Sequence, residues 1–219
     1  SVSDGEISDT ATVGLSVNAV NDAPVLASVS DVSFDEDGSG STSISASDVD
    51  GDDLDFSISG GTDITAILDG SSVSFSAPEN YNGSENFTVA VTDGTLSDSQ
   101  IITVTVNAVN DAPVATAGLS GTGDEDQSIS VLLSGSDVDG DVLTYSITST
   151  PTNGAVEISG SNATYTPGAD FNGSDSFTFT VSDGSLSDTS TVSLTVNAAN
   201  DAPVLDTVSD VAFDEDGSS

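Results

Sequence analysis

The stretch from Phe171 to Gly184, which reads FNGSDSFTFTVSDG, decides the fold of this chain. Within it the apolar residues Phe177, Phe179 and Val181 alternate with Thr or Ser. Alternation with a period of two is typical of a β-strand that buries one face. An Asn-Gly pair precedes this run and an Asp-Gly pair ends it, and both pairs are typical of turns. The stretch therefore predicts one strand of a sheet, with a turn at each end.

This stretch belongs to a repeat of about 90 residues. The phrase Asn-Asp-Ala-Pro begins at Asn21, Asn110 and Asn200. Other phrases recur at matching offsets: Asp-Glu-Asp from Asp35, Asp124 and Asp214, Asp-Val-Asp-Gly-Asp from Asp48 and Asp137, and Asp-Gly at Asp4, Asp93 and Asp183. A fixed period of this length indicates tandem structural units rather than a single-domain enzyme.

Period-two alternation continues through both full repeats. The expected inward positions are Leu54, Phe56, Ile58, Val73, Phe75, Phe87, Val89, Val91, Ile102, Val104 and Val106 in the first repeat, and Ile129, Val131, Leu133, Leu143, Tyr145, Ile147, Val156, Ile158, Ala163, Tyr165, Phe177, Phe179, Val181, Val192, Leu194 and Val196 in the second. About seven short strands in each unit predict an antiparallel β-sandwich. The predicted fold class is therefore all-β, with tandem antiparallel β-sandwich domains arranged end to end.

The landmarks also set the expected domain boundaries. Residues 21–109 and 110–199 form the two full units, each large enough to bury its own core. Residues 1–20 correspond to the last hairpin of a preceding unit, and residues 200–219 to the first strand of a following one. Neither end can bury a core alone, so each is expected to be frayed or docked on a neighbour unless the parent chain continues.

The charge of the chain is one-sided. It has 37 acidic residues and no Lys, Arg or His, so its formal net charge is −37. No salt bridge between side chains can form, and each carboxylate must face water, accept hydrogen bonds or bind a cation. Clustered carboxylate oxygens are the ligands that hard cations prefer, chiefly Ca²⁺. A solubilising acidic surface is the alternative reading.

The same composition excludes several functions. Binding to nucleic acid or to an anionic membrane surface needs positive charge, and the chain has none. No apolar run is long enough to span a bilayer, so direct membrane insertion is not expected. The absence of Cys rules out disulfides and thiolate metal sites, and the absence of Lys rules out a Lys–Asn isopeptide cross-link.

The acidic phrases fall into two sets when the strands are traced up and down a seven-stranded sandwich. The trace places the two sets at opposite ends of each unit, next to the linkers between units. At the junction of the two full units, the candidate cation ligands are Asp35, Glu36, Asp37 and Asn80 of the first unit, Asn110 and Asp111 of the linker, and Asp137, Asp139, Asp141 and Asp183 of the second. The equivalent residues of the other junctions are Asn21, Asp22, Asp48, Asp50, Asp52, Asp93, Asp124, Glu125, Asp126, Asp170, Asn200 and Asp201.

The phrase Asp-x-Asp-Gly-Asp does not form an EF-hand loop. Its Gly comes too early, and no Glu stands at position 12 counted from Asp48 or Asp137. A single copy is a modest signal whose alternative interpretation is an acidic turn, and the recurrence of three acidic phrases in one arrangement favours a cation site. Asp53 and Asp55 correspond to Val142 and Thr144 in the second unit, so we interpret them as surface charge.

The chain resembles the cadherin-like tandem repeats of very large bacterial surface and secreted proteins. The resemblance covers essentially the whole chain and rests on the linker phrase Val109–Pro113, the loop Asp137–Asp141 and the stretch Phe171–Gly184. It implies a cadherin-like or immunoglobulin-like sandwich, Ca²⁺ at the linkers, an extracellular or cell-surface location and a role in adhesion. The Asp-x-Asn-Asp-Asn linker of animal cadherins is shortened here to Asn-Asp, which leaves the number of Ca²⁺ ligands per junction open.

The function expected is that of a Ca²⁺-rigidified extender segment of a bacterial adhesin or extracellular filament, whose partners are the neighbouring repeats. The alternative is a module that binds polysaccharide, an activity that the resembled family includes, or another copy of the protein. Paired carboxylates also occur in glycosidases, but the chain has no His, Cys or Lys and few aromatic residues, so we expect no enzyme activity, no catalytic residue and no organic cofactor. Glycosylation sequons stand at Asn82, Asn86, Asn162 and Asn172, although turn geometry explains the Asn-Gly pairs equally well.

Overall fold

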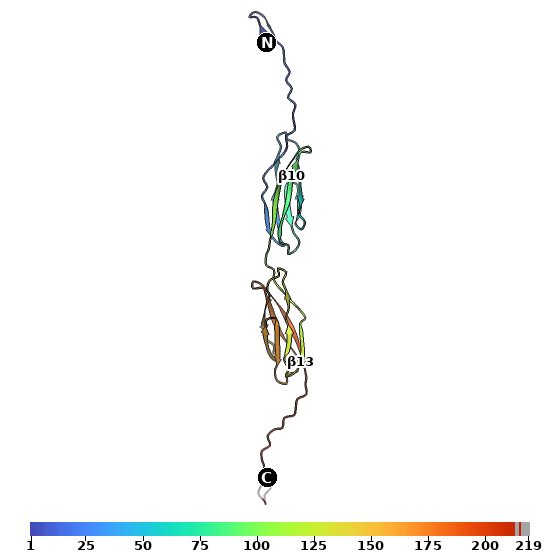
Figure 1. Ribbon diagram of the computed structural model, residues 1–219, viewed down its shortest axis with the longest axis vertical. Helices are drawn as coiled ribbons and strands as arrows, with labels where there is room; N and C mark the ends of the chain where they lie inside the picture. Colours follow the sequence, from blue (N-terminus) through green and yellow to red (C-terminus); the bar gives the residue numbers. More distant parts are fainter. Residues whose placement is uncertain (213–214, 216–219) are drawn as a thin grey trace. The chain divides into compact units, whose positions relative to one another are not determined.

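The computed structural model describes residues 1–212 and residue 215. The chain divides into two compact units, residues 1–109 and residues 110–219, and Figure 1 labels β10 in the first and β13 in the second. Strands and turns make up the regular structure of the described residues, so the all-β prediction is confirmed. No helix in the described part of the chain has the length and apolarity needed to cross a membrane.

Unit 1 is a sandwich of two sheets. The larger sheet has the order β4 (Val32–Asp35), β11 (Ser97–Asn107), β10 (Gly83–Thr92) and β7 (Asp55–Gly60). The smaller sheet has the order β5 (Ser39–Ser43), β9 (Ser72–Ser76) and β8 (Thr65–Asp69), and a short pair joins β3 (Val25–Leu26) to β6 (Ala46–Ser47). All pairs are antiparallel except that of β4 with β11.

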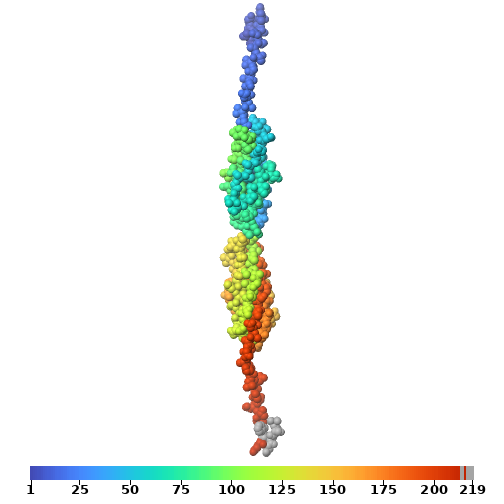
Figure 2. Space-filling model, turned by 90° about the vertical axis from the view of Figure 1, so that its right-hand side faces the viewer, coloured from blue at the N-terminus to red at the C-terminus, as the bar shows by residue number. Residues whose placement is uncertain are grey.

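Unit 2 repeats this topology strand for strand. Its larger sheet has the order β13 (Ser120–Asp124), β20 (Ser187–Asn197), β19 (Gly173–Ser182) and β16 (Thr144–Ser149). Its smaller sheet has the order β14 (Ile129–Leu132), β18 (Asn162–Pro167) and β17 (Gly154–Ser159), and β12 (Val114–Ala115) pairs with β15 (Gly135–Ser136). Figure 2 shows the orange-red segment of β20 beside the yellow-green segment that contains β13.

The first strand of each unit differs from the single strand that the sequence predicts. In unit 2 it divides into β12 and β13, and Gly118 between them has a φ of 75°, which favours glycine. β12 pairs antiparallel with β15, whereas β13 pairs parallel with β20. The chain thus crosses from one sheet to the other at this point, and one parallel pair enters an otherwise antiparallel sandwich.

The core follows the predicted alternation. Phe177, Phe179 and Val181 of β19 are at most 2% exposed, and the Thr residues between them face outward. In unit 1 the rings of Phe75 and Phe87 meet edge to face, with centroids 5.3 Å apart. Full burial of one such side chain stabilises a fold by about 1.5–3 kcal/mol, so these inward positions hold each sandwich together.

Half-buried carboxylates hold several loops in place, in a chain that has no basic side chain to do so. In unit 1 the carboxylate of Glu85 accepts hydrogen bonds from the backbone N–H groups of Thr62, Asp63 and Ile64 at 2.9–3.1 Å. We call such a carboxylate, which accepts backbone N–H groups from a distant segment, a carboxylate staple. Asp98 is a second staple, because it accepts the N–H of Leu26 at 2.9 Å.

Unit 2 has the equivalent staples. Asp175 accepts the backbone N–H groups of Thr152 and Asn153 at 3.0 and 2.8 Å, and also the hydroxyl of Tyr165 at 3.0 Å. Asp188 accepts the N–H of Ala115 at 2.9 Å. These roles were not predicted from the sequence, because most of the contacted groups belong to the backbone.

The two terminal segments form little regular structure. Between residues 1 and 20 only β1 (Val2–Ser3) and β2 (Ser8–Asp9) pair, and Val13, Leu15 and Val17 are 87–89% exposed. The sequence predicts the last hairpin of a preceding unit in this segment, with Val13, Leu15 and Val17 on its inward face, but these residues cover no second sheet within the described chain. Residues 200–212 form no strand, and Asp214 and Asp216 of the third Asp-Glu-Asp phrase lie outside the described residues.

Candidate cation-binding ends of each unit

In each unit the candidate ligands form two sets. We call the Asp-x-Asp-Gly-Asp loop, the Asn-Asp linker that precedes the unit and the Asp of the Asp-Gly turn after β10 or β19 the loop set. We call the acidic residues directly after β4 or β13, the residue Asn80 or Asp170 shortly before β10 or β19, and the linker that follows the unit the tip set. Asp93 follows the end of β10 and Asn80 precedes its start. Because a strand rises about 3.4 Å per residue, the ten residues of β10 separate the two sets by about 30 Å.

The loop set of unit 1 is organised by Asp48. Its Oδ1 accepts the backbone N–H groups of Asp50 and Gly51 at 2.8 and 3.1 Å, which closes the loop. Gly51 has a φ of 79°, so the turn requires glycine at this position. Carboxylate oxygens of Asp48, Asp50 and Asp52 then lie within 4.8 Å of one another.

The charges in this loop act on one another. Desolvation raises the pKa of Asp52, and the neighbouring carboxylates of Asp48, Asp50, Asp93 and Asp53 raise it further. Oδ2 of Asp48 is buried and has no hydrogen-bond partner within the described residues. The loop therefore brings negative charge together and leaves one of its oxygens without a donor.

The preceding linker is fixed to this loop. The backbone N–H of Asp22 donates to Oδ2 of Asp50 at 2.8 Å, and Nδ2 of Asn21 donates to Oδ2 of Asp93 at 2.9 Å. Oδ1 of Asp93 accepts the N–H of Leu96, and this bond and the bond from Asn21 lower the pKa of Asp93. Asp93 thus uses both oxygens to hold its own turn and the linker.

Unit 2 repeats part of the loop set, but among the described residues the carboxylates of Asp137, Asp139 and Asp141 do not form a group within 4.8 Å as those of unit 1 do. The N–H of Asp111 donates to Oδ2 of Asp139 at 2.8 Å, and the N–H of Asp141 donates to Oδ1 of Asp137 at 3.2 Å. Oδ2 of Asp137 is buried and has no hydrogen-bond partner in the part of the chain that the structure describes. The two units therefore agree in the contacts of the linker Asp and in the buried oxygen of the first loop Asp.

The turn beside this loop also matches unit 1. Nδ2 of Asn110 donates to Oδ2 of Asp183 at 2.9 Å, as Asn21 does to Asp93. This bond, followed by the N–H groups of Leu186 and Ser185, lowers the pKa of Asp183.

The tip set of unit 1 contains a buried glutamate. Glu36 is 6% exposed, and its Oε1 accepts the backbone N–H of Val109, the last residue of the unit. Its Oε2 has no hydrogen-bond partner among the described residues. Beside it the N–H of Asn80 donates to Oδ1 of Asp37 at 3.1 Å, and both of these residues have a positive φ, 57° and 59°.

The tip set of unit 2 includes the linker that follows it. Carboxylate oxygens of Asp126, Asp170 and Asp201 lie within 4.8 Å of one another. Desolvation raises the pKa of Asp201, and the charges of Asp170, Asp126 and Glu125 raise it further. Glu125 is 4% exposed and corresponds to Glu36.

Two candidate residues are placed apart from both sets. Asp35 and Asp124 accept hydrogen bonds from Nδ2 of Asn107 and Asn197 at 3.1 and 3.2 Å, and these bonds link β4 to β11 and β13 to β20. In the linker after unit 2, Nδ2 of Asn200 donates to the carbonyl of Asp201 at 3.2 Å. Asp53 and Asp55 are exposed and belong to neither group.

The oxygen atoms of both sets are suitable ligands for a hard cation. A buried carboxylate oxygen without a donor costs free energy, and the chain has no basic side chain to approach it. Ca²⁺ takes six to eight oxygen ligands in flexible geometry, which suits loops rich in carboxylates and backbone carbonyls. Asp48, Asp137 and Glu36 each offer an oxygen of this kind.

Comparison with known proteins identifies the repeat. A family model described as the bacterial Ig domain matches residues 21–106 and again residues 110–195. Among solved structures, human protocadherin-24 EC1-2 is 17% identical, with a TM-score of 0.54 over 82% of this chain and 100% of that one. At this identity the likeness shows the fold alone.

An enzyme also appears among the similar structures. The endo-fucoidan hydrolase MfFcnA4 from glycoside hydrolase family 107 is 24% identical, with a TM-score of 0.34 over 81% of this chain. The match spans 29% of the length of that enzyme. None of the curated proteins matches this sequence.

Proposed function

This chain belongs to the bacterial Ig domain family, and from that premise we propose that it is a Ca²⁺-rigidified structural segment of a bacterial surface or secreted protein. The observation that carries the proposal is the buried carboxylate oxygen without a donor, which recurs at Asp48, Asp137 and Glu36. The two loop oxygens occupy the same position in the repeat, so they represent a feature of the unit rather than an accident of one loop.

The linker Asp supports a role for the cation in holding the linker. Asp22 and Asp201 occupy equivalent positions of the repeat. Asp22 stands in the linker before unit 1, and Asp201 stands in the linker after unit 2. The N–H of Asp22 bonds to the loop set of its unit, and the carboxylate of Asp201 lies in the tip set of its unit. We expect each linker Asp of the array, including Asp111, to contribute to both sets.

A cation bound in either set would also hold the linker residues that belong to that set. In unit 1 Val109 is held by Glu36, and in unit 2 Asn110 is held by Asp183. Each of these bonds lies within one unit and fixes the linker residue nearest to it. The proposed role is mechanical: Ca²⁺ neutralises the carboxylates and stiffens the linker, and adhesion is the process that such a segment serves.

A Ca²⁺ titration of two charge-matched variants tests the proposal. Asp48→Asn keeps the Oδ1 acceptor but removes one charge from the loop set, so we expect Ca²⁺ affinity to fall about tenfold or more. Asp53→Asn removes the same charge from an exposed position outside the set, so the affinity should change by less than about twofold. Equal losses in the two variants would show that the carboxylates attract Ca²⁺ only through general surface charge.

A further inference from the structure

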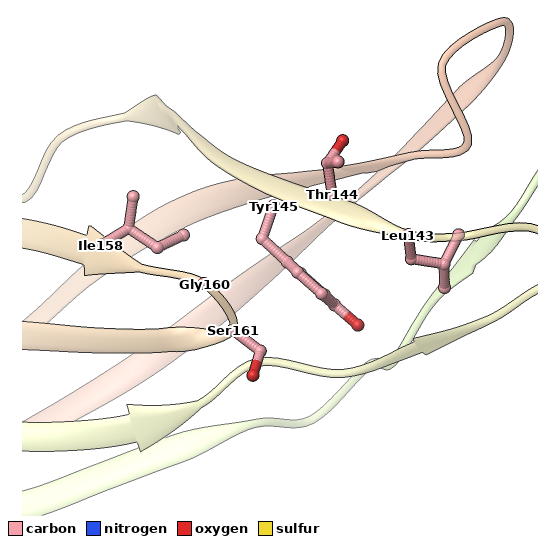
Figure 3. A pocket seen from close by; sticks show the side chains of 6 residues that line it. All are labelled: Leu143, Thr144, Tyr145, Ile158, Gly160 and Ser161. Carbon is pink, nitrogen blue, oxygen red and sulfur yellow. The ribbon is translucent and has the colours of Figure 1, made fainter.

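A surface pocket of about 360 Å³ opens on unit 2 between β16 and the turn that joins β17 to β18. Six residues line it (Figure 3): Leu143, Thr144, Tyr145, Ile158, Gly160 and Ser161. Both β16 and β17 are edge strands of their sheets, so among the residues that the structure describes no further strand pairs with them on this side. The pocket lies within a size range that is common for small-molecule sites.

The lining combines an apolar surface with two available hydroxyl groups. Leu143 and Ile158 are half-buried and pack against the core, and the half-buried ring of Tyr145 lies 6.5 Å from the ring of Phe179, which helps to fix its orientation. Figure 3 shows the hydroxyls of Tyr145 and Ser161 on the same side of the pocket. Neither hydroxyl has a hydrogen-bond partner among the residues that the structure describes.

The hydroxyl of Thr144 already forms a hydrogen bond within the unit. It donates to the carbonyl of Ser182 at 3.1 Å, and its side chain points away from Tyr145 in Figure 3. The hydroxyls of Tyr145 and Ser161 are thus the side-chain hydroxyls of the lining that remain for a ligand.

The charge of the chain narrows the class of ligand. None of the six lining residues is charged, although the net charge of the chain is −37. An anionic ligand would be repelled without any basic residue to hold it, and a cation would bind the carboxylate sets instead. A purely apolar ligand would cover two hydroxyls and leave them without partners, which costs free energy.

We propose that this pocket binds one neutral pyranose residue of a polysaccharide. The C–H face of such a ring matches the apolar side chains, and its hydroxyls match those of Tyr145 and Ser161. This binding activity is separate from the proposed Ca²⁺ role, because no carboxylate lines the pocket.

Unit 1 provides an internal contrast. The residues at the positions equivalent to Thr144 and Tyr145 are Asp55 and Phe56. Unit 1 therefore lacks the phenol hydroxyl and carries a carboxylate beside the equivalent position. We expect sugar binding in unit 2 alone, at one site per chain.

The test records backbone amide spectra of the ¹⁵N-labelled full chain during titration with three neutral tetrasaccharides, cellotetraose, maltotetraose and mannotetraose. We expect at least one of them to shift the amides of residues 143–145 and 158–161, with a dissociation constant on the order of 1 mM. Tyr145→Phe keeps the ring and removes the hydroxyl, so it should weaken binding about fivefold, the equivalent of one hydrogen bond.

A matched control separates the pocket from a general effect of tyrosine. Tyr81→Phe removes a phenol hydroxyl in unit 1 and should leave the affinity unchanged. The proposal is overturned if no neutral tetrasaccharide shifts these amides, if Tyr145→Phe binds as well as the native chain, or if tetragalacturonate, which is anionic, binds with the same affinity. Dispersed amide spectra for each variant would show that its fold is intact.

Discussion

Nδ2 of Asn172 donates a hydrogen bond to Oε2 of the buried Glu125 at 3.0 Å, which gives both oxygens of this carboxylate a partner, since Oε1 accepts the N–H of Ala199. In unit 1 the equivalent Glu36 has only one of these bonds, from Val109 to Oε1. The two tip sets are therefore alike in sequence and unlike in their need for a further ligand.

This difference predicts opposite effects of one variant in two conditions. Glu36→Gln keeps an acceptor for Val109 and removes the unpaired anionic oxygen, so in chelator it should raise the stability of unit 1 by about 1 kcal/mol. In saturating Ca²⁺ it should lower the melting temperature, because a ligand has been weakened. Thermal unfolding in both conditions measures the effect. A shift of the same sign in both would show that Glu36 does not contact a cation.

Chelation of Ca²⁺ should act on both stability and stiffness. Removing the cation leaves the carboxylates of Asp48, Asp50 and Asp52, and those of Asp126, Asp170 and Asp201, close together with no basic side chain in the chain to offset them, so the melting temperature should fall. High NaCl should restore part of it, because the Debye length near physiological ionic strength is only about 8 Å. It should not restore linker stiffness, which requires direct coordination. Small-angle scattering and melting curves, recorded with Ca²⁺, with chelator and with chelator plus NaCl, distinguish these effects. Full recovery of the scattering profile by NaCl alone would contradict the Ca²⁺ proposal.

The staples of unit 2 should make the fold sensitive to acid. Hydrogen bonds lower the pKa of Asp188 below its ordinary value of 3.8, the largest effect coming from the N–H of Ala115. Desolvation acts to raise the pKa of Asp175, but the N–H groups of Thr152, Asn153 and Ser176 and the hydroxyl of Tyr165 outweigh it, so this pKa is also lowered. A carboxyl group with a lowered pKa stabilises the fold above the unfolded value and loses that contribution as the pH falls through the folded value.

The acidic sets should respond in the opposite direction when Ca²⁺ is absent. The pKa values of Asp52 and Asp201 are raised, so their protonation relieves repulsion in the window just above 3.8. Urea unfolding in chelator should therefore show a small gain in stability as the pH approaches this window from above, followed by a loss below 3.8. A steady loss beginning near neutral pH would mean that repulsion within the sets is negligible.

Tyr165 and Asp175 should behave as a coupled pair. Burial and the bond to Asp175 raise the pKa of Tyr165 to about 12, so its hydroxyl stays protonated and donates at all ordinary pH values. Unit 1 has Phe75 and Glu85 at the equivalent positions, and the longer Glu side chain accepts a third backbone N–H instead. Tyr165→Phe should destabilise unit 2 by about 0.5–1.5 kcal/mol.

The double variant Tyr165→Phe with Asp175→Glu reproduces the pair found in unit 1. It should recover at least half of the stability lost in Tyr165→Phe, as measured by urea unfolding in a double-mutant cycle. Additive losses would show that the two units fix these loops in different ways.

The sequence predicted the sandwich because burial leaves a strong pattern. A buried face demands apolar residues at every second position, and Phe177, Phe179 and Val181 meet that demand visibly. It did not predict the staples of Glu85 and Asp175, because their partners are backbone N–H groups that every residue except Pro possesses. The parallel pairing of β13 with β20 was also missed, since alternation defines a face and not the direction of the neighbouring strand.

The staples have a consequence for how such arrays diverge. Glu85 holds the N–H groups of Thr62 and Asp63, and Asp175 holds those of Thr152 and Asn153, so the side chain at the second contacted position differs while the bond to the backbone persists. A carboxylate that accepts hydrogen bonds from backbone N–H groups does not require particular side chains on the residues that it holds. Substitutions can therefore accumulate in these loops without a compensating change elsewhere, and duplicated copies can drift apart in surface chemistry while they keep one architecture.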